Sequence, residues 1–240
     1  MKFTKDIEVD IHDVDYNGVA RLSSVMKYMQ CAAQGQLNSV GMTYDALHER
    51  GYAFILSKIR LELDEPIYAY QHIFATSYPC NSRGYSWLRC YHLSRDGAVI
   101  GRAASVWALV NVNTRALVRV NEFEFGITPE AKNELSVERL LAPDNLSPVG
   151  EYTVHYGELD QNRHMNNTRY PDIYSSFLPL ENKRIRSITI SYLHEAREGD
   201  RLTVLRGRMS DGGYYFRTLC PSGEINTEAE IVLTDIVCKN

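Results

Sequence analysis

The sequence predicts an α+β protein built from two similar halves, each an antiparallel sheet wrapped around a central helix. The order strand, polar loop, helix occurs twice, because Asp15-Tyr16-Asn17 aligns with Asp160-Gln161-Asn162 at an offset of 145 residues. Mostly β-like runs follow each helix, and turns such as Asp211-Gly212-Gly213 separate them. Strands joined by tight turns pair antiparallel. An internal repeat of this kind indicates one fold unit made twice.

Composition is that of a globular protein: 240 residues, 44% hydrophobic and 23% charged, which is enough to bury a real core. A formal net charge of -4 disfavours general nucleic-acid binding. The sequence has no stretch of about 18 uncharged apolar residues and no apolar signal core at its start. We therefore expect no membrane span and a cytoplasmic location.

The first half begins with an alternating stretch at Ile7, Val9 and Ile11, which predicts a strand. After the polar loop, apolar residues recur with the 3.6-residue period of a helix and stop at Gly41, a residue type favoured just past helix ends. This helix carries Leu22, Val25, Met26, Met29, Ala32, Ala33, Leu37 and Val40. A short helical piece is expected over 44–49, with strands over 53–63, 71–78, 85–93 and 99–112.

The second half repeats this order. Alternation at Tyr152, Val154 and Tyr156 predicts a strand, and Asn166 or Asn167 can cap a shorter helix that Pro179 ends. Strands are expected over 185–192, 201–208, 214–219 and 226–236. Prolines within 128–150 indicate a short helix plus a linker. The predicted division is an N-terminal domain over 1–135, a linker over 136–148 and a C-terminal domain over 149–240.

Five cysteines are present, an odd number with wide spacing and no C-x-x-C pair. This pattern argues against a disulfide framework and against a zinc site. We expect reduced thiols at Cys31, Cys80, Cys90, Cys220 and Cys238.

The second polar loop places Asp160, Asn162 and His164 at alternate positions. If the segment is extended, the three side chains project to one side. A histidine can take a proton from water near neutral pH, an asparagine can donate to a carbonyl oxygen that gains negative charge, and an aspartate can orient its neighbours. This set suits thioester hydrolysis without a covalent nucleophile.

A purely structural interpretation of the loop also has to be weighed, because Asp and Asn often serve only to cap or turn a chain. The first half is an internal control: it keeps Asp15 and Asn17 but has Val19 where the second half has His164. A turn therefore explains the two shared residues and leaves the histidine unexplained, which assigns the chemistry to the second half.

The run D-x-N-x-H-x-N-N, followed by a tyrosine-bearing helix, resembles the active-site loop of the acyl-acyl carrier protein (ACP) thioesterases of plants and bacteria. Further segments extend the resemblance over nearly the whole chain: Trp87, Ser105-Val106-Trp107 with Asn111 and Thr114-Arg115, and Ile190-Ser191-Tyr192 leading to Glu195. The resemblance implies a tandem double hotdog fold, with an N-terminal hotdog domain that encloses the acyl chain and a catalytic C-terminal one.

By the same resemblance, Asp160, Asn162, His164 and Glu195 fall on the family's catalytic positions, and the activity is release of free fatty acid from acyl-ACP, which ends chain elongation. Plant members carry a cysteine directly after the glutamate, where this chain has Ala196. We therefore favour attack by water, assisted by His164 and Glu195, and expect no metal and no cofactor. The plant-type transit peptide is also missing, which points to a bacterial-type enzyme.

Several points stay open on the sequence alone. Leu22, Met26 and Met29 are candidates to line an acyl tunnel, with Asn166 and Asn167 as further substrate-binding candidates, but an apolar helix stripe is also typical of plain core. A local excess of basic residues over 183–217 could steer an acidic carrier protein. An acyl-coenzyme A thioesterase and a non-hydrolytic acyl-binding protein are the alternatives. The sequence leaves a homodimer open.

Overall fold

Both halves of the chain contribute strands to one continuous antiparallel sheet. In the computed structural model, which describes residues 1–124, 126–129 and 133–236, this sheet has eleven strands. The strands of the first half are β1 (Phe3–Glu8), β2 (Tyr52–Leu63), β3 (His72–Pro79), β4 (Trp87–Arg95), β5 (Ala98–Asn111) and β6 (Leu117–Val118). Those of the second half are β7 (Ser147–Thr153), β8 (Lys183–Tyr192), β9 (Arg201–Arg208), β10 (Tyr214–Leu219) and β11 (Ile225–Asp235).

Three α-helices and four short 3₁₀ helices complete the described part of the chain. They are α1 (Leu22–Ser39), α2 (Tyr44–Glu49) and α3 (Tyr170–Ser175), with η1 (Ile11–Asp13), η2 (Val120–Glu122), η3 (Tyr156–Glu158) and η4 (Asn167–Arg169). Within the described ranges, no helix is both long enough and apolar enough to cross a membrane.

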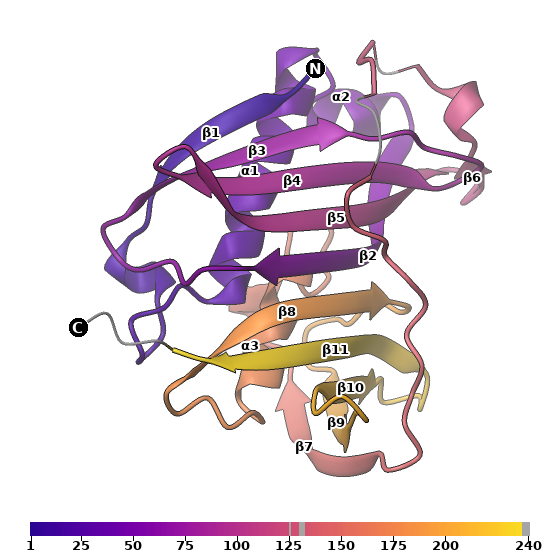
Figure 1. Ribbon diagram of the computed structural model, residues 1–240. Coiled ribbons are helices and arrows are strands. Elements are labelled where there is room, and N and C mark those ends of the chain that lie inside the picture. The colour runs from indigo at the N-terminus through magenta and orange to yellow at the C-terminus, as the bar shows by residue number, and fades with distance from the viewer. Residues whose placement is uncertain (125, 130–132, 237–240) are drawn as a thin grey trace.

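The two half-sheets meet where β2 pairs with β8. The strand order is β1-β3-β4-β5-β2-β8-β11-β10-β9-β7, with β6 added beside β5, and Figure 1 shows the first-half strands stacked above β8 and β11. Within this seam Leu61 is opposite Ile188, and both side chains are fully buried. Burying each of these side chains is worth about 1.5–3 kcal/mol, so the seam is a strong joint.

Helices α1 and α3 lie behind the sheet in Figure 1. One hydrophobic core spans both halves and includes Val25 and Met29 of α1, Ile173 and Tyr174 of α3, and Ile188 of β8. The predicted fold class, two antiparallel sheets each with its own helix, is therefore confirmed, and the two sheets are fused edge to edge.

The element predictions differ from the structure at three of the predicted segments, and the short strand β6 has no predicted counterpart. Ile11 and Tyr156 lie beyond the ends of β1 and β7, in η1 and η3, and are 55% and 78% exposed. The chain turns early at the first of these because the Asp10 side chain accepts from the backbone N of His12 and caps η1. Within 128–150, the described residues contain no helix, and β7 begins at Ser147, inside the segment predicted as linker.

The cysteine prediction is wrong for one pair. Cys80 and Cys90 form a disulfide, with their Cα atoms 6.4 Å apart. Cys80 directly follows β3, and its N–H donates to the carbonyl of Leu88 in β4, so hairpin pairing brings the two thiols together. Spacing along the sequence does not reveal this register. Cys31 and Cys220 are free thiols, and Cys238 lies outside the described residues.

A side-chain amide also joins the halves. Asn17 Nδ2 donates to the backbone carbonyls of Leu180 (2.8 Å), which lies between α3 and β8, and Lys183 (3.3 Å), the first residue of β8. The first-half loop is thereby tied to the second half.

We expect Asn17→Ala to lower the free energy of unfolding by about 1–2 kcal/mol, because two partly buried carbonyls lose their donor. Urea denaturation followed by circular dichroism measures this. The matched control is Asn162→Ala, the equivalent asparagine of the repeat, which is exposed and should cost less than about 0.5 kcal/mol. Equal losses in the two variants would contradict this account of the joint.

Candidate active site

A cavity of about 1080 Å³ opens between the two halves. The first half supplies most of its wall, from α1, α2, β2 and β4, and the second half supplies one end. The second-half residues in the wall are Asp160, Gln161, Asn162, His164, Met165, Asn166, Asn167, Tyr170, Tyr192, Leu193, His194 and Glu195. All four residues that the sequence predicts as catalytic therefore face one cavity.

The segment that carries Asp160, Asn162 and His164 is a tight turn and not an extended strand, so the assumption behind their shared direction is wrong. Asp160 donates its N–H to the carbonyl of His164 at 2.8 Å, and Arg163 adopts a φ of 63°. The Asp160 carboxylate accepts from the backbone N–H groups of Asn162 (2.8 Å) and His164 (3.4 Å). Asp160 holds the turn in shape, as Asx turns generally do.

The first half contains the same turn. Asp15 donates its N–H to the carbonyl of Val19 at 2.8 Å, and its carboxylate accepts from the N–H groups of Asn17 (2.9 Å) and Val19 (3.2 Å). Gly18, with a φ of 74°, stands where the second half has Arg163. The aspartate thus serves the backbone in both halves, and only the second turn carries an imidazole.

That ring, His164, is paired with Glu195. The Nε2 atom of His164 lies 3.0 Å from a carboxylate oxygen of Glu195, and the two side chains are 25% and 54% exposed. The loop after β8 reaches the turn because the N–H of Met165 donates to the carbonyl of Ala196 at 2.8 Å. The pair is therefore open to solvent and to the cavity.

The first half has neither member of this pair at the equivalent positions. There the N–H of Ala20 donates to the carbonyl of Ile67 at 2.8 Å, the counterpart of the Met165–Ala196 bond. Val19 and Pro66 consequently occupy the positions of His164 and Glu195. Neither can titrate, so the two turns differ in the groups that carry proton chemistry.

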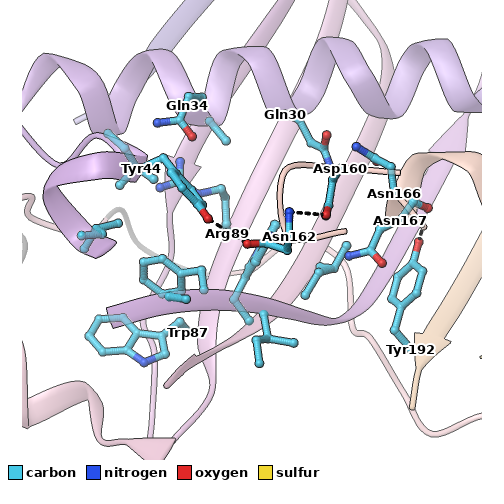
Figure 2. Close-up of a pocket in the computed structure, with 18 of the residues that line it drawn as sticks. Gln30, Gln34, Tyr44, Trp87, Arg89, Asp160, Asn162, Asn166, Asn167 and Tyr192 are labelled. Atoms are coloured by element: carbon cyan, nitrogen blue, oxygen red, sulfur yellow. Dashed lines mark hydrogen bonds between the residues drawn. The ribbon is translucent and has the colours of Figure 1, made fainter. Parts of the chain in front are cut away.

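Asn162 faces the cavity with its amide held in place from the first half. The Tyr44 hydroxyl, on α2, donates to Asn162 Oδ1 at 2.8 Å, and Figure 2 shows this bond beside the one between Asp160 and Asn162. With Oδ1 engaged, the Nδ2 group has no hydrogen-bond partner among the described residues. It is a donor available to a ligand oxygen. Sequence reasoning missed Tyr44, because nothing local marks a contact across 118 positions.

Asn166 and Asn167 line the cavity, but they differ in their contacts. Asn166 Oδ1 accepts from the N–H and the hydroxyl of Thr168 and caps η4. Asn167 accepts from the Tyr192 hydroxyl through its backbone carbonyl at 2.9 Å, which leaves its side chain directed into the pocket in Figure 2.

Leu22, Met26 and Met29 do not line this cavity. All three are buried, with exposures of 6%, 1% and 1%, and belong to the hydrophobic core. A different stripe of α1 lines the cavity, and its residues are Lys27, Gln30, Cys31, Ala33, Gln34 and Leu37. A helix between a core and a cavity presents an apolar stripe to the core, and periodicity alone reports that stripe.

The first-half wall combines aromatic and polar groups. Phe54 packs edge-on against Trp87 and Trp107, with ring centroids 5.9 and 6.4 Å apart. Arg89 also lines the cavity, and burial lowers the pKa of its guanidinium while the neighbouring Tyr91 raises it. Arginine stays charged in proteins, so the wall contains a cation. Strand alternation could have revealed it, since Arg89 shares a face with Trp87 and Tyr91.

A thiol at the ion pair is poorly suited to nucleophilic attack. Cys220 Sγ lies 3.9 Å from the backbone carbonyl of Glu195. Burial, followed by the charges of Asp200 and Glu224, raises the pKa of this thiol, and the thiol form is the less reactive one. Among the described residues, no group of three or more His, Cys, Asp and Glu side chains is arranged to hold a metal.

Comparison with known proteins places the site in context. The family model described as the acyl-ACP thioesterase N-terminal domain matches residues 1–125, and the corresponding C-terminal domain model matches residues 142–234. The chain is 26% identical over 79% of its length to oleoyl-acyl carrier protein thioesterase 2 of Arabidopsis thaliana, and 22% identical over 97% to the palmitoyl-acyl carrier protein thioesterase of the same plant. These matches cover 58% and 61% of the two relatives, so the chain spans about three fifths of their length.

Solved structures show the same fold. A crystal structure of an acyl-ACP thioesterase from Bacteroides thetaiotaomicron superposes with a TM-score of 0.89 at 24% identity, covering 97% of this chain and 98% of that one. The 12:0-ACP thioesterase from Umbellularia californica superposes with a TM-score of 0.82 at 18% identity, covering 98% of each chain. The tandem architecture is thus the double hotdog, and the chain belongs to the acyl-ACP thioesterase family.

Proposed function

We propose that this chain hydrolyses fatty-acyl thioesters carried on acyl carrier protein and releases free fatty acid. The observation that carries the proposal is the His164–Glu195 pair beside the amide of Asn162, at one end of a cavity whose other walls come from the first half. The repeat has Val19 and Pro66 at the positions of the pair, so the pair is not a requirement of the fold. The names of the family and of its relatives support the choice of thioester.

The two halves divide the work in this proposal. Residues 1–135 enclose the acyl chain between α1 and the inner face of β2 and β4, where Phe54, Trp87 and Trp107 supply apolar area. Residues 149–240 supply the reacting groups, and the intervening linker connects them. Burial of an alkyl chain against such a wall is worth about 0.8 kcal/mol per CH₂ group.

The reaction needs water activated beside the thioester carbonyl. Water attacks the carbonyl carbon, its proton passes to the His164–Glu195 pair, the carbon–sulfur bond breaks, and the thiolate leaves and takes up a proton. If His164 Nε2–H donates to Glu195, the free lone pair of the ring is on Nδ1 and the imidazole is the base. If the carboxylate is the base, the imidazole orients it. The amide of Asn162 donates to the carbonyl oxygen as negative charge develops there.

The carrier protein is acidic, and two exposed arginines flank the reacting ring. Arg163 precedes His164, and Arg197 pairs with it in a β-bridge. Most of the basic residues over 183–217 are engaged within the chain instead: Lys183 with Asp235, Arg184 with the carbonyls of Leu63 and Asp64, Arg201 with Glu151, Arg206 with the carbonyl of Phe177, Arg208 with that of Gly212, and Arg217 with Glu228. We therefore place the docking surface at Arg163 and Arg197.

The base is identified by two conservative variants. We expect His164→Gln to lower kcat by about 10²–10⁴-fold, the usual range for loss of a general base. Glu195→Gln should lower it less, because the amide oxygen can still accept from the ring. Free-thiol release from palmitoyl-ACP is the measurement. The reverse order of effects would assign the base to Glu195, and full activity in both variants would exclude the proposed site. Cys220→Ala, as control, should retain turnover.

The tyrosine from the first half should act through Asn162. We expect Tyr44→Phe to lower kcat by about tenfold, the loss of roughly one hydrogen bond to a polar group, with no change in the unfolding midpoint. The double variant Tyr44→Phe/Asn162→Ala should be no slower than Asn162→Ala alone, because the two side chains then act as one unit. Additive losses would show that Tyr44 does not position this amide.

The carrier is tested by turnover of palmitoyl-ACP against palmitoyl-coenzyme A. We expect a larger kcat/KM for the ACP substrate, and a decline with added salt, since exposed charges are screened. Reversal of charge at Arg163 and Arg197 should raise KM for palmitoyl-ACP about tenfold and change kcat little. A preference for the coenzyme A thioester would make the chain an acyl-coenzyme A thioesterase, and absence of turnover with either would leave an acyl-binding protein.

A further inference from the structure

The guanidinium of Arg89 lines the first-half part of the cavity and has only neutral hydrogen-bond partners. Its Nη1 donates to Gln36 Oε1 at 2.5 Å and to Ser77 Oγ at 2.8 Å, and both partner residues are fully buried. Gln36 is fixed in turn, because its Nε2 donates to the carbonyl of Met1 and so directs the amide oxygen at Arg89. The cation is therefore surrounded by oriented neutral groups.

No acidic side chain in the described part of the chain forms an ion pair with Arg89. The acidic residues of the cavity wall are Asp160 and Glu195. Asp160 is bonded to its own turn and Glu195 to His164. Arg89 is partly buried, and a wholly apolar occupant would remove it further from water without supplying a partner. Unpaired burial of a charge is costly, so an occupant that brings an oxygen acceptor to Arg89 is favoured.

The geometry of the unused donors narrows the choice of acceptor. Arg89 uses Nη1, which leaves Nε and Nη2 without a hydrogen bond among the described residues. These two atoms form one edge of the planar guanidinium, the edge that binds carboxylates elsewhere in the chain. Arg217 places Nε and Nη2 on Glu228 Oε1 at 3.2 and 2.6 Å, and Arg60 places the same two atoms on Glu62 Oε1 at 2.9 and 2.5 Å. A fork of this kind matches a carboxylate.

We propose that Arg89 makes the cavity a binding site for acyl chains that carry an oxygen acceptor away from the thioester, with a terminal carboxylate as the best match. The substrate class is then the ACP half-thioester of a dicarboxylic acid. This inference rests on the proposed function for its carrier and reaction. It adds a specificity-determining residue to a wall that is otherwise suited to plain alkyl chains. Arg89 lies on β4 in the first-half wall, whereas Asn162, His164 and Glu195 line the second-half end of the cavity.

The first test uses the wild-type protein. Turnover is measured for ACP thioesters of octanoyl, decanoyl and dodecanoyl chains, each plain, ω-hydroxylated and ω-carboxylated. We expect one chain length at which the carboxylated substrate exceeds the plain one in kcat/KM by roughly 10- to 100-fold, as a charge-assisted hydrogen bond pair allows. A larger gain for the hydroxylated chain would keep the oxygen acceptor and assign it to a hydroxyl. Plain chains preferred at every length would overturn the proposal.

Variants then assign the preference to Arg89. Arg89→Met should abolish the ratio between carboxylated and plain chains, and Arg89→Lys, which keeps the charge but not the fork, should retain only part of it. Arg60→Gln is the matched control, because Arg60 lies outside the cavity wall, and it should retain the full ratio. An unchanged ratio in Arg89→Met would show that the guanidinium is only part of the cavity wall and does not bind the carboxylate.

A binding measurement separates this inference from the proposed function. Calorimetry on the His164→Gln variant compares the methyl esters of octanoic, decanoic and dodecanoic acid with the monomethyl esters of suberic, sebacic and dodecanedioic acid, so that each pair differs only in the terminal carboxylate. Tighter binding of the carboxylated ester at one chain length, lost on adding Arg89→Met, supports the site even if no acyl carrier substrate is hydrolysed. Equal binding within all three pairs contradicts it even if plain acyl-ACP is turned over.

Discussion

The pairing of β2 with β8 is the constraint on which the candidate site depends. Five residue pairs, from Lys58 opposite Ser191 to Glu62 opposite Ser187, fuse the two half-sheets in one register. At one end of the seam, the buried Arg184 donates to the carbonyls of Leu63 and Asp64. A shift by one residue would turn every side chain of β8 to the other face. The loop after β8, which carries Glu195, therefore reaches the first-half cavity in only one register.

The same turn occurs in both halves, and its two copies differ at a few side chains. Comparing them distinguishes the residues that form the turn from the residues that carry the chemistry. Asp15 and Asp160 make the same backbone bonds, so the carboxylate is needed wherever this turn occurs. Asn17 and Asn162 occupy equivalent positions but have different partners: the first amide ties the halves together, and the second is held by Tyr44 beside the cavity. The repeat shows which residue types the turn requires, and His164 is the residue it does not require.

Local patterns predicted the elements, whereas the cavity depends on contacts that no local pattern reports. The α1 helix, the strands and the cap at Asn166 follow from periodicity and turn chemistry, both of which act within a few residues. The prediction for Leu22, Met26 and Met29 was wrong because α1 faces core and cavity with different stripes. Tyr44 and Arg89 were missed because their roles arise from pairing across the fold. The Cys80–Cys90 disulfide was missed for the same reason, since it depends on hairpin register.

A buried asparagine, Asn226, holds the backbone of the loop that carries Glu195. The Glu195 side chain is half exposed. Packing therefore does little to fix its rotamer, and its placement depends on the backbone of its loop. Asn226, fully buried on β11, accepts from the N–H groups of Leu193 and His194 through its backbone carbonyl. Its side chain donates to the carbonyl of His194 (2.5 Å) and to the Tyr170 hydroxyl (3.0 Å). Burial raises the pKa of Tyr170, so this phenol stays protonated and remains a neutral acceptor. Fixed donors of this kind hold a reacting group more precisely than contacts of its own exposed side chain can, which explains how a loop with few contacts presents a carboxylate at 3.0 Å from an imidazole.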